Sequence, residues 1–278
     1  MNAPGVPVAN SARWQATLEL EYAAGAARTY LKHWQHTGPL LVQRAFHPEP
    51  GGICHSYLLH PPSGLVGGDQ LQLRARLGAG SQVLLTTPAA TKFYRSAGPT
   101  ARLQQTLELA DGAAGEWLPQ ENILFDGARA WLNTRIELHG SARFIGWEIT
   151  CFGRPACAEH FGRGRADVGF ELYRDGRPLL LDRLRVDGTS PAGGAALRGH
   201  AVSASLIATG ADRALLERLR EVDAAAVLGG VTLLGDVIVC RALAALTAPV
   251  RDWFERLWTL LRPHLLGRPA CAPRIWAT

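Results

Sequence analysis

Stretches in which apolar and polar residues alternate occupy much of the chain up to about residue 208. Leu18, Leu20 and Tyr22 alternate with polar neighbours in one stretch, and Leu71 and Leu73 begin another. A period of two indicates β-strands with one buried face. Turns rich in Gly and Asp follow roughly every 8–15 residues, a spacing that favours many short strands over alternating strands and helices. The pattern therefore predicts a mainly β protein.

One hairpin and two helices can be placed more closely. Asp175 and Gly176 lie between two apolar runs, which predicts a β-hairpin with a two-residue turn. Apolar residues at helical spacing predict one helix over 211–223 and a second over 247–265. Two apolar strands are expected between these helices, so the last part of the chain mixes helix and strand.

The change of pattern near residue 208 does not predict a second domain. A chain of 278 residues is near the upper limit for one hydrophobic core. The only linker-like stretch, 188–200, is interpreted as a loop. We therefore expect a single domain over residues 1–278, with a β-rich body over about 14–208 and an α/β part over about 209–265.

Composition is typical of a globular protein without a nucleic-acid or membrane partner. The chain is 47% apolar and 19% charged, and its net charge of +5 comes from scattered arginines rather than one basic run. No uninterrupted apolar stretch is long enough to span a membrane, and the first residues do not resemble a signal peptide. Five cysteines without a C-x-x-C pair indicate free thiols. Together these features predict a cytoplasmic protein.

The search for catalytic motifs finds no assembled set. The glycine-rich Gly64–Asp69 matches neither the P-loop nor the dinucleotide fingerprint, and a strand follows it. The pairs His33/His36 and His55/His60 have no cysteine or carboxylate at metal-ligand spacing, so they do not predict a structural metal site. The motifs therefore predict a protein that is not an enzyme.

Acidic residues inside apolar strands are the unusual feature of the sequence. Glu148 follows Trp147 in one such strand, and Asp182 follows three leucines in another. Buried carboxylates are costly unless they are paired, hydrated or bound to a cation. Strand alternation puts Glu148 opposite Trp147, so one side of that strand can line a cavity. Two explanations stay open: ion pairs with arginines such as Arg183 and Arg185, or a polar passage through the interior.

Five sequence blocks carry a resemblance to a known family. They are GLVGGDQLQL (64–73), LLTTPAATKFYRS (84–96), EWLPQENILFDGA (116–128), GRPACAEHF (153–161) and LRPHLLGRPACAPRIWAT (261–278). In this order and spacing they resemble the UreD family of urease accessory proteins, also called UreH. The matching positions that we single out are Gly67, Gly68, Asp69, Lys92, Tyr94, Arg95, Glu116, Pro119, Gln120, Gly153, Arg154, Pro155 and Glu159.

Two positions depart from the family pattern. Ala158 precedes Glu159 where the family commonly has Gly, and His47 precedes Pro48 where the family often has Tyr. The first departure suggests that the turn before Glu159 does not strictly require positive φ. We assign no role to the second.

The resemblance implies a fold and a function. It implies a β-solenoid-like body, an irregular β-helix of many short strands, with two α-helices near the C-terminus. It also implies a scaffold or conduit, not an enzyme, that acts with the helical protein UreF and, through it, with the GTPase UreG. Nickel would pass through this complex to apo-urease, so Ni²⁺ is expected in transit and no cofactor is expected to be permanently bound.

Specific residues follow from combining this resemblance with the strand pattern. Asp69, Glu148 and Asp182 are predicted as points along an interior nickel path. A divalent cation in transit must be held weakly, which isolated oxygen or imidazole ligands do better than a closed Cys/His cluster. The helix carrying Trp253 and Trp258 is one candidate for the partner interface.

Two other functions remain as alternatives. The protein can be a pure interaction module that holds apo-urease open without contacting nickel. It can also be a hydrolase or transferase that uses Lys92, Tyr94 and Arg95 with Glu121. Family context favours the nickel scaffold over both.

Overall fold

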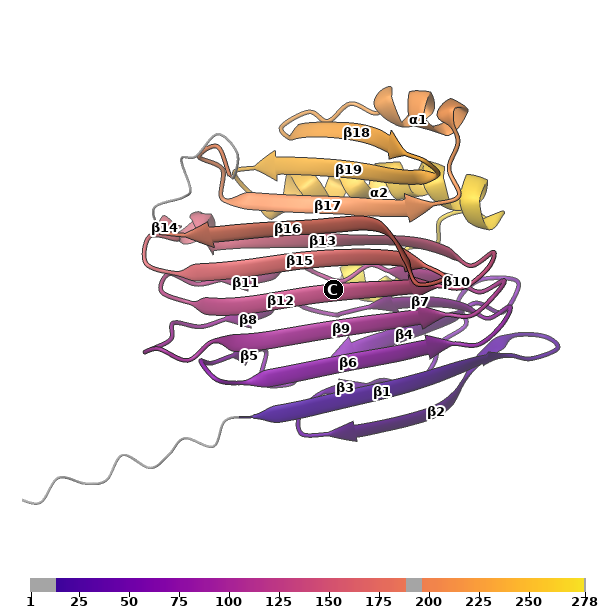
Figure 1. The fold of residues 1–278 in the computed structure, drawn as a ribbon, viewed down its shortest axis with the longest axis horizontal. Helices are drawn as coiled ribbons and strands as arrows, with labels where there is room; N and C mark the ends of the chain where they lie inside the picture. Colours follow the sequence, from indigo (N-terminus) through magenta and orange to yellow (C-terminus); the bar gives the residue numbers. More distant parts are fainter. Residues whose placement is uncertain (1–13, 189–196, 278) are drawn as a thin grey trace, which may run out of the picture.

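Two facing β-sheets form the body of the protein in the computed structural model, which describes residues 14–188 and 197–277 (Figure 1). The seven-stranded sheet has the order β16 (Arg177–Asp187), β15 (Arg165–Arg174), β12 (Arg129–Leu138), β9 (Ala101–Leu109), β6 (Gln70–Leu77), β1 (Gln15–Ala24) and β2 (Thr29–Thr37). The twelve-stranded sheet runs from β18 (Leu228–Leu234) through β19 (Val237–Ala244), β17 (Val202–Thr209), β13 (Arg143–Arg154), β10 (Ala114–Trp117), β7 (Gln82–Thr86) and β4 (Cys54–Leu59) to β3 (Leu41–Val42). Four short strands branch from this path: β5 (Gly64–Leu65), β8 (Thr91–Phe93), β11 (Asn122–Leu124) and β14 (Glu159–His160).

The chain winds between the two sheets as a solenoid of about four turns. Strands β1, β6, β9, β12 and β15 pair in parallel along one sheet, and β4, β7, β10 and β13 do so along the other. Gln70, Arg102, Trp131 and Asp167 therefore stack at equivalent positions of successive turns. The inward residues of both sheets form the first hydrophobic core. The predicted mainly β, solenoid-like fold with two late helices is confirmed.

Local chemistry explains two of the turns. Asp175 (φ +49°) and Gly176 (φ +74°) connect β15 to the antiparallel β16, as expected for a two-residue hairpin with both central residues at positive φ. At Gly67, a Cβ would lie 2.1 Å from the Ser96 hydroxyl oxygen, so only glycine fits where two turns of the solenoid touch. The predicted hairpin is confirmed.

The two predicted helices cover the outer face of the twelve-stranded sheet. Helix α1 (Arg213–Arg220) begins at Asp212, whose carboxylate accepts a hydrogen bond from the Leu215 amide. Helix α2 (Thr247–Leu266) ends at Gly267, which adopts the left-handed conformation usual after a helix. Both helices contribute to a second hydrophobic core with the outward residues of β13, β17 and β19. The strands predicted between the helices are β18 and β19.

Trp253 and Trp258 lie inside this second core, so the expected partner interface on them is corrected. Each is only 2% exposed. Trp258 packs edge-on against Trp147 of β13 with ring centroids 6.5 Å apart, and its indole nitrogen donates to the Glu116 carboxylate. The aromatic side chains of α2 face the protein interior because the outer face of β13 is itself apolar and packs against them. Two predictions fall outside the described residues. One is most of the loop expected over 188–200, namely 189–196. The other is the absence of a signal peptide at the N-terminus.

Candidate functional site

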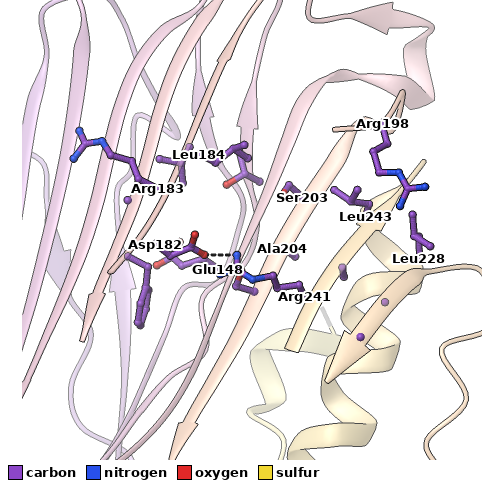
Figure 2. Close-up of a pocket in the computed structure, with 18 residues that line it drawn as sticks. Glu148, Asp182, Arg183, Leu184, Arg198, Ser203, Ala204, Leu228, Arg241 and Leu243 are labelled. Carbon is purple, nitrogen blue, oxygen red and sulfur yellow. Dashed lines mark hydrogen bonds and ion pairs between the residues drawn. The ribbon is translucent and has the colours of Figure 1, made fainter. Parts of the chain in front are cut away.

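A row of polar residues crosses the inward face of the twelve-stranded sheet. Glu148 on β13 pairs with Ser205 on β17, and Ser205 pairs with Arg241 on β19. The seven-stranded sheet ends at β16, whereas the twelve-stranded sheet continues through β17, β19 and β18. A cavity of about 490 Å³ lies where the two sheets part, and this polar row lines it (Figure 2). We call it the Glu148 cavity.

Asp182 and Arg241 close one side of the Glu148 cavity. The Arg241 guanidinium reaches from β19 to the Asp182 carboxylate on β16, with 2.5 Å between Nη1 and Oδ2, so this ion pair joins the two sheets (Figure 2). Asp182 is therefore ion-paired with an arginine, one of the two explanations left open for it, but the arginines named as candidates, Arg183 and Arg185, pair with Asp167 on β15. They are not the partners of Asp182 because neighbouring residues of a strand point to opposite faces.

The Glu148 carboxylate is held only by neutral donors. Oε1 accepts hydrogen bonds from the Trp117 indole nitrogen at 2.9 Å and from the Thr134 hydroxyl at 2.7 Å, and Oε2 accepts a longer one from Asn122. No ion pair reaches it among residues 14–188 and 197–277. Burial raises the pKa of Glu148 above its usual range, although the three hydrogen bonds favour the charged form. Glu148 is partly exposed, and its accessible side lines the cavity.

A polar wall lies behind the Glu148 carboxylate, on the side of the seven-stranded sheet. Gln105 on β9 and Thr134 on β12 are adjacent in an inward column that otherwise includes Leu73 and Phe170. Thr134 Oγ1 lies 2.7 Å from Glu148 Oε1 and 2.7 Å from Gln105 Oε1. One hydroxyl proton cannot serve two acceptors, so with Glu148 ionised the Gln105 amide must turn its nitrogen towards Thr134. The wall is a chain of hydrogen bonds rather than an apolar layer.

Asp69 lies apart from this group. Its side chain is 2% exposed and accepts hydrogen bonds from the backbone amides of Trp14 at 3.0 Å and Val66 at 2.9 Å. It does not line the Glu148 cavity. Two of the three acids predicted along the path, Glu148 and Asp182, are therefore brought together, and Asp69 is a turn-stabilising residue.

Other residues from the family motifs lie in turns of the solenoid and in contacts between its elements. Arg154 pairs with Glu159, and Glu159 also accepts from the Asp126 backbone amide. This contact closes the turn that begins at Gly153 (φ +88°). Ala158 has φ +56°. The turn therefore does adopt positive φ, although an alanine at this position had suggested that positive φ was not strictly required.

The cluster proposed for a hydrolase divides between different contacts. Tyr94 packs edge-on against Phe125 with ring centroids 5.0 Å apart. The Glu121 carboxylate pairs with Arg251 of α2 at 3.3 Å and not with Lys92. Within the described part of the chain, the ion pair of Glu121 with Arg251 thus holds α2 against the sheet.

The block around Glu116 has two further contacts with neighbouring elements. The Pro119 carbonyl accepts a hydrogen bond from the Trp147 indole nitrogen at 2.9 Å. The Gln120 backbone amide donates to the Thr87 hydroxyl at 2.9 Å. These contacts hold the block in place on neighbouring turns of the solenoid.

A buried charge network beneath α2 was not predicted from the sequence. Arg262 is fully buried and bonds the carboxylates of Glu116 at 3.0 Å and Glu49 at 2.6 Å, while His55 bonds Glu49 at 2.7 Å. Burial raises the pKa of Glu116 despite Arg262 and the Trp258 indole. Burial acts in the same direction on Glu49, but its bonds from His55 and Arg262 prevail and lower its pKa to about 2. The signals in the sequence were an arginine within the apolar stripe of α2 and an acid, Glu116, among large apolar residues.

The described residues hold no tight metal centre and no membrane span. No group of three or more His, Cys, Asp or Glu side chains in residues 14–188 and 197–277 can hold a metal ion together. Across the same ranges, no helix has both the length and the apolar character needed to cross a bilayer. All five cysteines are free thiols, as predicted.

Comparison with known proteins gives one consistent result. The profile described as UreD urease accessory protein matches residues 15–277. A protein named urease accessory protein UreD from Azoarcus sp. (strain BH72) is 49% identical, over 95% of this chain and 94% of its own length. Proteins of the same name are 45% identical in Alcanivorax borkumensis, over 95% of this chain and 92% of theirs, and 43% identical in Dechloromonas aromatica, over 97% and 96%.

Proposed function

Since the chain belongs to the UreD family of urease accessory proteins, we propose that it is a scaffold and conduit through which Ni²⁺ reaches apo-urease. In this proposal it acts in a cytoplasmic complex with UreF and, through UreF, with the GTPase UreG. The protein performs no turnover of its own; it positions its partners and provides an interior route for the cargo.

The Glu148 carboxylate is the observation that carries this proposal. It is partly buried, it faces a cavity, and it has three neutral donors and no cationic partner among the described residues. An ionised carboxylate in such a place is unfavourable, and a divalent cation beside it would relieve the cost. One carboxylate with hydroxyl groups nearby binds a cation weakly enough to release it again.

Asp182 supplies a second oxygen contact at the same cavity. Its carboxylate is engaged by Arg241, but that arginine is 55% exposed on its side chain and can turn towards solvent. Ser203 and Ser205 also line this cavity. A cation could therefore pass from Asp182 to Glu148 in short steps between oxygen ligands. Asp69 has no place on this route because backbone amides occupy its carboxylate.

The interaction-module alternative has one observation in its favour. Tyr30 and Trp34 on the edge strand β2 are 44% and 53% exposed, and exposed aromatic side chains are common at protein interfaces. This surface fits a docking role for the chain, with or without nickel transfer. It replaces Trp253 and Trp258 as the aromatic surface available to a partner.

Substitution of Glu148 tests the conduit directly. Glu148→Gln removes the charge but keeps an oxygen acceptor for Trp117 and Thr134, so the fold should persist. We expect normal pull-down with UreF, and lower nickel content and activity in the matured urease. Glu148→Arg should be worse, because a cation in the cavity repels Ni²⁺. Glu137→Gln, which alters an outward carboxylate on β12 paired with Arg135, is the matched control.

The paired measurements distinguish the alternatives. Loss of both the complex and nickel transfer would make Glu148 a structural residue. Full urease activation by Glu148→Gln, with an intact complex, would favour the interaction module over the conduit.

A further inference from the structure

A second cavity lies behind the polar wall of the Glu148 cavity. It has a volume of about 400 Å³ and is lined mainly by aliphatic residues. Gln105 and Trp117 line it, and the same two residues hold Thr134 and Glu148 at the wall. The two cavities are therefore separated by the thickness of one hydrogen-bonded layer. The exposed Pro61 and Ala89 form part of the rim of the second cavity, which thus reaches the surface between different turns of the solenoid.

His60 is the one imidazole that lines this second cavity. Both of its ring nitrogens are buried, and neither has a hydrogen-bond partner among the described residues. Trp14 packs edge-on against the ring with centroids 6.3 Å apart, which holds its position without bonding a nitrogen. Burial lowers the pKa of His60 and the nearby Asp69 opposes this only in part, so the ring is neutral near pH 7. A neutral imidazole has a free lone pair available to a metal ion.

The contacts of His60 give no structural reason for its lack of hydrogen-bond partners. A buried polar atom without a partner destabilises the fold, so an aliphatic side chain would stabilise this position better. Unsatisfied buried polar groups call for an explanation such as a ligand that binds there. A divalent transition cation fits, since imidazole nitrogen is a preferred ligand of Ni²⁺.

We infer that the second cavity is a further stage of the cation route and that His60 is its nickel-binding residue. This inference rests on the proposed conduit function. The cation would leave the oxygen ligand Glu148, pass the wall of Gln105, Thr134 and Trp117, and bind a single imidazole, with water completing its coordination. One protein ligand keeps the site weak, as transit requires. The route would then continue to the rim at Pro61 and Ala89.

Histidine resonances offer a direct test with the full chain. The protein has nine histidines, and ¹³C-labelled imidazoles can be followed individually while NiCl₂ is added. We expect the paramagnetic ion to broaden the His60 signal first, and His60→Leu to abolish that broadening. The same variant should fold at least as stably as the parent, because it removes unsatisfied polar atoms. It should nevertheless lower the nickel content of urease matured with it several-fold. Leu73→Met, which changes an apolar lining residue, is the control and should match the parent.

Each outcome separates this inference from the proposed function. Broadening at His60 together with a maturation defect in His60→Leu supports the second stage. If Glu148→Gln lowers maturation while His60→Leu does not, the conduit stands and the His60 stage is overturned. An unbroadened His60 signal at NiCl₂ concentrations that broaden other histidines also overturns it. If neither variant affects maturation, the conduit itself fails.

Discussion

The Trp117 indole nitrogen donates a hydrogen bond of 2.9 Å to the Glu148 carboxylate, from a neighbouring strand of the same sheet. Trp117 also forms part of the second cavity, so one side chain contacts both the acid of one cavity and the lining of the other. Its ring provides the apolar bulk that separates the cavities, and its single N–H orients the carboxylate. Position 117 therefore combines packing with a polar function, which explains why a fully buried tryptophan keeps its nitrogen bonded.

Trp117→Phe should separate these two roles. The substitution keeps an aromatic ring in the wall but removes a donor from a buried carboxylate. We expect the free energy of unfolding to fall by about 1–3 kcal/mol, as for other buried groups that lose a partner. Because the charged form of Glu148 loses support, its pKa should rise further. Urea denaturation and the ¹³C chemical shift of the Glu148 carboxyl measure the two effects. An unchanged carboxyl titration would show that the indole does not control the charge of Glu148.

Arg262→Met should show how far the buried charge network stabilises α2. The change leaves two carboxylates, Glu49 and Glu116, buried without their shared cation. We expect a loss of about 3–5 kcal/mol in the free energy of unfolding, as when one partner of a buried ion pair is removed. The triple variant with Glu49→Gln and Glu116→Gln should recover much of the loss. If it recovers nothing, packing by Arg262 and not its charge stabilises the helix.

Alternation and helical spacing were enough to predict much of the fold. They identified several strands, the Asp175–Gly176 hairpin and both late helices, because these features depend on local sequence. The stacking of turns into a solenoid was predicted only from the family resemblance. The turns share a pattern of inward apolar residues, but they have no exact sequence repeat. The side of α2 that carries Trp253 and Trp258 was misjudged, because an apolar stripe does not reveal whether the chain or a partner covers it.

The candidate site was harder to predict than the fold, for a physical reason. The arginines beside Asp182 were the candidates for an ion pair with it, but its partner Arg241 lies 59 positions away on the other sheet. Strand geometry directs adjacent side chains to opposite faces, so sequence neighbours are poor candidates for ion pairs. Glu148 was identified because an acid inside an apolar strand is unusual in itself. His60 was considered only as one half of a metal pair with His55 and was set aside, because its lack of hydrogen-bond partners is visible only in three dimensions.

Stability should fall in acid through Glu49. Its ordinary pKa is 4.5, and in the folded protein it is lowered to about 2 by the bonds from His55 and Arg262. A depressed carboxyl pKa stabilises the fold at pH values above 4.5, and that contribution disappears as pH falls from about 4.5 towards 2. We expect the urea midpoint of the parent to drop across this range. Glu49→Gln should have a lower midpoint at pH 6 and a shallower drop, whereas Glu217→Gln on the surface of α1 should match the parent. Parallel pH profiles for Glu49→Gln and the parent would contradict the assignment.

The Asp182–Arg241 pair should matter more for cation passage than for stability. Its arginine is 55% exposed and its aspartate 24% exposed on their side chains, and half-exposed pairs contribute roughly 0–1 kcal/mol. Arg241→Gln frees the Asp182 carboxylate at the mouth of the Glu148 cavity, so Ni²⁺ should bind more tightly in equilibrium dialysis and leave more slowly. Asp182→Asn should do the reverse. Arg185→Gln provides the control, because Arg185 also pairs with Asp167 and does not line the Glu148 cavity. If Arg241→Gln and Arg185→Gln change nickel binding equally, general surface charge accounts for the effect and the pair does not guard the cavity. If only Arg241→Gln changes it, while both variants keep the parental urea midpoint, the effect belongs to the carboxylate that faces the interior.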